Sequence, residues 1–105
     1  MPDQHIPQQT IQKVLRLKDS ILSMKTPPRL KGYQSGWDAM AASLWVLKRY
    51  GIMSHRGVKR YIKRVFRKTW TRGELDPILC FLKDAGAIRR IPVMRRLQIG
   101  RIYSI

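Results

Sequence analysis

The segment LWVLKRYGIMSHRGVKRYIKRVF, residues 44–66, contains the change of pattern that decides the fold. An apolar helical stretch ends at Lys48 and Arg49, two cations suited to the negative end of a helix dipole, and Gly51 suits the position after the last turn. Ser54 can then cap a second helix, in which an apolar stripe recurs at spacings of three and four. We therefore predict two helices joined by a short turn.

The first of these helices is predicted to begin near Ser35. Ser35 and Asp38, three residues further on, resemble a capping box. The apolar residues that follow cover more than one stripe, which predicts a central, widely buried helix. They are Trp37, Met40, Ala41, Leu44, Trp45 and Leu47.

A third helix is predicted over about residues 72–85, with two possible starts. Thr71 with Glu74 matches a capping box, whereas Asp76 followed by Pro77 matches a cap with proline at the first helical position. Both starts leave one apolar face along the helix.

The pattern changes to short strands after Gly86, which is predicted to close the third helix. Residues 87–93 and 99–105 are rich in β-branched side chains, and the basic sequence MRRLQ lies between them as a turn. Pro92 places the first strand at an edge or a bulge.

Upstream, residues 10–24 show a helical period, and the proline- and glycine-containing residues 25–36 are predicted to be a linker. We therefore divide the chain into an N-terminal helix with its linker, residues 1–36, and a body, residues 37–105. The predicted fold class is mainly α with a small β-hairpin wing (α+β). Three helices followed by a hairpin give the outline of a winged helix-turn-helix, here with an extra N-terminal helix.

The composition is strongly basic, with 22 Lys and Arg against 6 Asp and Glu and a net charge of +16. Self-repulsion of that size opposes compaction, so a polyanionic partner is expected, with nucleic acid ahead of an anionic membrane or an acidic protein. The alternative is a chain that is merely basic. A single cysteine, Cys80, the absence of an apolar run of about 20 residues and the lack of a leader-like N-terminus predict a cytoplasmic, nucleoid-associated protein without membrane contact.

The candidate nucleic-acid-binding residues fall in three groups, each able to contact phosphates. The alternative for each group is a solvated basic surface. The basic helix supplies Arg56, Lys59, Arg60, Lys63, Arg64, Arg67 and Lys68. The start of the third helix supplies Thr71 and Arg72, where backbone N–H groups favour phosphate. The hairpin supplies Arg89, Arg90, Arg95, Arg96 and Arg101.

The third helix lies where a recognition helix would lie, but its charge does not suit a major groove. Glu74, Asp76 and Asp84 would repel the duplex more readily than they would read cytosine edges. We therefore expect backbone contacts from the basic helix and the wing rather than strong base reading by this helix.

The remaining residues of chemical interest are interpreted mainly as core. Trp37, Trp45 and Cys80 are predicted to pack inside, while Trp70 is equally compatible with the core and with a stacking platform for bases. His55 has no acidic neighbour in sequence, and the chain has no metal-ligand spacing or phosphate-binding glycine loop. We predict no enzymatic activity, no cofactor and no metal.

The segments LWVLKRYGIMSHRGVKRYIKRVF, LDPILCFLKDAGAIRRI and IGRIYSI together resemble a known family. Residues 37–105 are similar to the winged-helix domain at the C-terminal end of primase/helicase-type replication proteins of plasmids, prophages and integrated elements. The primase and ATPase parts have no counterpart in this chain. The residues that match the frame are Leu79, Leu82, Gly86, Gly100, Arg101, Tyr103 and Ile105.

This resemblance implies binding to duplex or forked DNA at the origin of a mobile element, alongside replication machinery. Three alternatives stay open: a small winged-helix transcriptional repressor, an RNA-binding module, and a protein-interaction domain for an acidic partner. The repressor alternative predicts dimerisation and a two-fold symmetric site.

Overall fold

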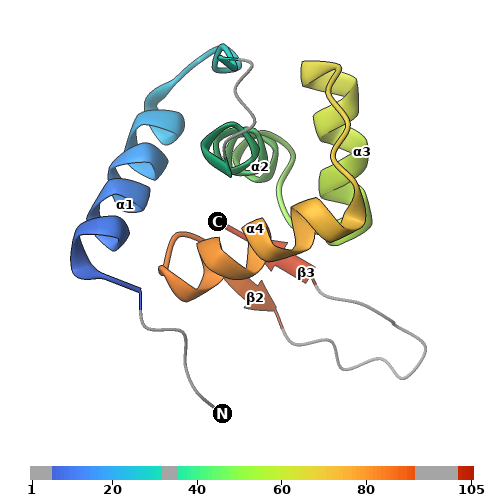
Figure 1. Cartoon of the computed structure of the whole chain (residues 1–105). Coiled ribbons are helices and arrows are strands. Elements are labelled where there is room, and N and C mark those ends of the chain that lie inside the picture. The colour runs from blue at the N-terminus through green and yellow to red at the C-terminus, as the bar shows by residue number, and fades with distance from the viewer. Residues whose placement is uncertain (1–5, 32–35, 92–101) are drawn as a thin grey trace.

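A computed structural model describes residues 6–31, 36–91 and 102–105. The described chain is mainly helical with a small β component, as the sequence predicted, but the sheet has three antiparallel strands where a two-stranded hairpin was predicted (Figure 1). The elements in chain order are α1 (Gln8–Ser23), α2 (Gly36–Tyr50), β1 (Met53–Ser54), α3 (His55–Phe66), α4 (Arg72–Asp84), β2 (Arg89–Ile91) and β3 (Ile102–Ser104).

Helix α2 is the centre of the molecule, which confirms the prediction of a widely buried helix. It contacts α1, α3, α4 and β3, and α1 and α3 lie on opposite sides of it (Figure 1). Its residues 38–47 are all buried. Trp45 belongs to this core, but the prediction for Trp37 was wrong: its side chain is 40% exposed, because it lies in the first turn before α2 enters the core.

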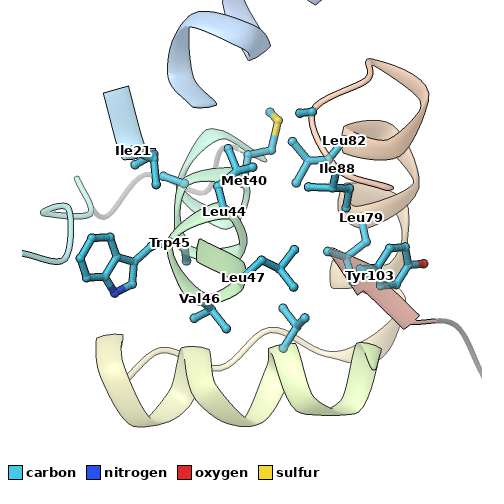
Figure 2. Close-up of a cluster of buried hydrophobic side chains, with 14 of the residues drawn as sticks. Ile21, Met40, Leu44, Trp45, Val46, Leu47, Leu79, Leu82, Ile88 and Tyr103 are labelled. Carbon is cyan, nitrogen blue, oxygen red and sulfur yellow. The ribbon is translucent and has the colours of Figure 1, made fainter. Parts of the chain in front are cut away.

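The core is built from all four helices and the sheet. Val46 of α2 points toward α3, while Leu79 and Leu82 reach in from α4 (Figure 2). Val14 and Ile21 bring α1 into the same cluster. Helix α1 thus packs on the body, although a linker was predicted after it.

Local signals fixed the helix boundaries where they were predicted. Ser54 caps α3, since its Oγ accepts a hydrogen bond from the Gly57 N–H over 3.2 Å. Gly51 ends α2 at φ +90°, and its N–H donates to the Leu47 carbonyl oxygen over 3.0 Å. Such a backbone conformation favours glycine. The proposed cap Ser35 lies outside the described residues.

The sheet has the strand order β1-β3-β2, with both neighbouring pairs antiparallel. Strands β2 and β3 lie within the two predicted strands, and the predicted basic turn between them lies outside the described residues. Strand β1 was not predicted. Its Met53 pairs with Tyr103 of β3, and Tyr103 pairs on its other side with Arg90 of β2.

Candidate nucleic-acid interface

Helix α3 separates an apolar face from a cationic face. Val58 and Ile62, four residues apart, are buried against α2 and its neighbours. The opposite side of the helix carries Arg56, Arg60, Lys63 and Arg64, all of them exposed. Among the described residues, no Asp or Glu carboxylate forms an ion pair with the α3 cations. The charge of this helix is therefore directed at solvent and left uncompensated.

Four of the predicted cations come together around one shallow hollow of about 460 Å³. Arg60, Lys63 and Arg64 lie at positions i, i+3 and i+4 of α3, so the helical repeat places them on one face. Arg67, the residue after the helix, joins them at the same hollow. Thr69, which the sequence analysis did not single out, completes the lining. We call this site the basic hollow; it is lined by Arg60, Lys63, Arg64, Arg67 and Thr69.

The path of the chain after α3 creates the hollow. Arg67 follows the last residue of α3 in the left-handed conformation, at φ 58° and ψ 29°, and its N–H donates to the Lys63 carbonyl oxygen over 2.9 Å. The chain then turns and residues 67–71 run back along α3 to the start of α4 (Figure 1). This return segment brings Thr69 beside the cations of α3.

The start of α4 is fixed by the capping box of Thr71 and Glu74, which confirms the first of the two predicted starts. Pro77 lies inside the helix instead of at its first position. The N–H and the hydroxyl group of Thr71 are both used in this cap, whereas Arg72 is exposed. The hydrogen bonds from the Thr71 backbone and side chain lower the pKa of Glu74 below its ordinary value of 4.5.

The other predicted contact residues lie apart from the hollow or differ in exposure. Lys59 and Lys68 are half-buried. Arg89 and Arg90 are exposed on β2, but consecutive strand residues point to opposite faces of a sheet. Strand β2 is also separated from β1, the strand next to α3, by β3. The predicted wing residues Arg95, Arg96 and Arg101 lie outside the described residues.

Near α3, one aromatic side chain joins the core and two others stack on each other. Trp70, left open by the sequence analysis, is half-buried and packs against the core, so it attaches the return segment to the core. Tyr50, the last residue of α2, stacks instead on Tyr61 of α3, with ring centroids 4.2 Å apart and an angle of 18° between the planes. Sequence analysis missed this pair, because only the packing of α2 on α3 brings the two rings together.

Comparisons with protein families, curated proteins and solved structures gave no match to this chain. Within residues 6–31, 36–91 and 102–105, no helix has the length and apolar character needed to cross a membrane. The same described residues contain no group of three or more His, Cys, Asp or Glu side chains that could hold a metal ion. The candidate site is thus defined by charge, exposure and shape.

Proposed function

We propose that this protein is a winged helix-turn-helix domain that binds nucleic acid, with duplex or forked DNA as its ligand. The contacts would be made to the phosphate backbone by the basic hollow and the exposed face of α3. The resemblance to replication proteins suggests the origin of a mobile element as the setting. In this proposal, the affinity for DNA comes from the positive charge and the shape of this surface. Base recognition by α4 has a minor role.

The order of the elements supports the fold assignment. Helices α3 and α4 follow one another across a short connection, as in a helix-turn-helix, and β2 and β3 follow them as an antiparallel pair. A winged helix also has a short strand before its helix-turn-helix, and β1 occupies that position beside β3. The acidic residues Glu74 and Asp84 on α4 argue for contact through α3 instead.

The observation that carries the functional proposal is the basic hollow itself. Four guanidinium or ammonium groups surround one open depression, and no carboxylate of the described residues is paired with them. Holding like charges together costs electrostatic free energy, which a bound polyphosphate backbone would offset. Thr69 can add a neutral hydrogen bond to a phosphate oxygen.

A charge-reversal pair tests the proposal. The double variant K63E/R64E alters two exposed residues of the hollow, and K13E/R16E makes the same charge change on the exposed face of α1, on the other side of α2. Binding to random-sequence duplex DNA is measured by fluorescence anisotropy over a salt series. We expect K63E/R64E to lose at least about 100-fold in affinity at 100 mM salt and to flatten the log–log salt slope by about 2.

The control K13E/R16E should lose less than about 10-fold in DNA affinity, because it changes only the overall electrostatic field of the protein. Equal losses of affinity in the two variants would mean that DNA binding depends on the net charge of the protein and not on a particular surface. Unchanged affinity in K63E/R64E would reject the hollow as the binding site. Circular dichroism of both variants verifies that the helices persist. Parallel titrations with double-stranded RNA and with an acidic polypeptide separate the proposed duplex-DNA ligand from the two alternative partner classes.

A further inference from the structure

Tyr50 and Tyr61, which we call the tyrosine step, form an aromatic surface with an inner and an outer ring. Tyr61 is half-buried and packs against the core, so it is the inner, fixed ring. Tyr50 lies on it at a centroid distance of 4.2 Å, and the residue is 42% exposed. An aromatic ring that packs on a second ring and is partly exposed to solvent can act as a stacking platform.

Tyr61 of the tyrosine step is close on α3 to a residue that lines the basic hollow. Tyr61 and Arg64 are separated by three positions on α3, so they are neighbours on the same flank of the helix, and Arg64 lines the hollow. A further cation comes from α2, since the guanidinium of Arg49 lies over the Tyr50 ring, with its carbon 5.6 Å from the ring centre. The outer ring is thus bordered by positive charge from two helices.

This combination has a specific ligand chemistry. A positively charged groove beside an exposed aromatic ring suits a nucleotide whose base is free to stack while its phosphate contacts the cations. A base inside a duplex presents its edge in the groove and keeps its faces stacked on neighbouring base pairs, so it cannot use the ring. The step therefore distinguishes unpaired from paired nucleotides.

We infer that the tyrosine step binds an unpaired nucleobase by stacking on Tyr50, while the basic hollow holds the adjoining phosphates. The inference rests on the proposed function and narrows it to nucleic acid with a single-stranded segment, such as the unpaired arm of a fork. The Arg49 guanidinium, which lies over the Tyr50 ring, must move aside to admit the base, and it can then stack on the outer face of that base. The face of a base carries no sequence code, so the site accepts different bases and both DNA and RNA.

The test compares single-stranded and duplex probes of about 12 nucleotides or base pairs, within the range of known single-strand sites. The probes are oligothymidylate, oligouridylate and a random duplex, at one salt concentration. Y50A removes the outer ring, and Y50L keeps apolar packing on Tyr61 without an aromatic face. Y50F keeps the ring, and I52A is the control, because Ile52 is 62% exposed and two residues away but has no ring.

We expect Y50A and Y50L to lose at least about 5-fold in affinity for both single-stranded probes, the lower end of what one stacked base contributes. Y50F and I52A should stay within about two-fold of the wild type, as should the duplex affinity of every variant, because the phosphate contacts remain. Unchanged single-strand affinity in Y50A and Y50L, or an equal loss on duplex, would overturn the inference while leaving the proposed function standing. Wild-type protein that binds none of the three probes would instead reject the proposed function.

Discussion

Thr71 and Glu74 hold the start of α4 by two reciprocal hydrogen bonds. The Thr71 N–H donates to Glu74 Oε1 over 2.9 Å, and the Glu74 N–H donates to Thr71 Oγ1 over 3.2 Å. Because the return segment ends at this cap, the pair fixes one end of the chain that completes the basic hollow. The same cap therefore stabilises α4 and helps to hold the return segment in position at the candidate site.

The first prediction concerns pH. The pKa of Glu74 is lowered in the folded protein by its hydrogen bonds to Thr71, so the ionised cap stabilises the fold above the unfolded pKa of about 4.5. That contribution is lost as the pH falls through the lowered folded pKa. Thermal unfolding between about pH 6 and pH 3 should show a steeper loss of stability in the wild type than in E74Q. Equal pH dependence in the two proteins would contradict this role of Glu74.

The second prediction separates stability from binding at Arg67. The left-handed backbone of Arg67 is strained for a residue with a Cβ, so R67G should raise the free energy of unfolding by about 0.5–1 kcal/mol. The same change removes a cation of the hollow and should reduce the salt slope of DNA binding by about 0.9. Urea unfolding and anisotropy measure the two effects. The control R67A should lose the binding contribution without the gain in stability.

The third prediction concerns the attachment of α1. The Lys48 Nζ donates to the Ile21 carbonyl oxygen over 3.2 Å and also to that of Met24, and it lies 4.8 Å from the centre of the Trp45 ring. K48M should lower the free energy of unfolding by about 1–2 kcal/mol, because both carbonyl groups lose a charged donor. Hydrogen exchange should increase mainly in α1.

The exposed neighbour Arg49 supplies the control for this third prediction. R49M removes the same charge at the same helix end. Within the described residues, however, Arg49 donates no hydrogen bond to an α1 carbonyl, so no such bond is lost. It should cost less than about 0.5 kcal/mol. A loss as large as that of K48M would show that the helix dipole, and not the bonds to α1, accounts for the effect.

The fourth prediction concerns salt. The uncompensated cations on α3 repel one another, and the screening length falls from about 30 Å at 10 mM salt to about 8 Å at 150 mM. The unfolding temperature should therefore rise over this range, and K63E/R64E should show a smaller rise because the repulsion has already been reduced. A stability that falls with added salt would mean that attractive pairs dominate the surface.

Much of the helical structure was predictable, because its signals are local. Ser54, Thr71 and Gly51 each act within one helical turn, and the structure uses all three as caps or helix ends. Strand β1 was not predictable, since two residues show no alternation and pair only through the distant β3. The turn of the chain at Arg67 was not predictable either, because the residue in the left-handed conformation is an arginine and not a glycine.

The candidate site was predictable in part for the same reason. The sequence of α3 contains Lys and Arg but no Asp or Glu, and the helical repeat groups Arg60, Lys63 and Arg64 on one face. Thr69 and the tyrosine step depend on how distant segments pack, so no spacing in the sequence indicates them. The exposure of Trp37 likewise depends on where α2 enters the core.

The pairing of Met53 with Tyr103 has a consequence for the order of folding. Bringing these two positions together closes a long loop. The chain loses conformational entropy in that step before the hydrogen bonds of the sheet can compensate for it. The helices, whose contacts are mostly short in range, should form first, and β3 should insert between β1 and β2 as a late event. Pulse-labelling of the Tyr103 amide during refolding would then show protection later than the amides of α3.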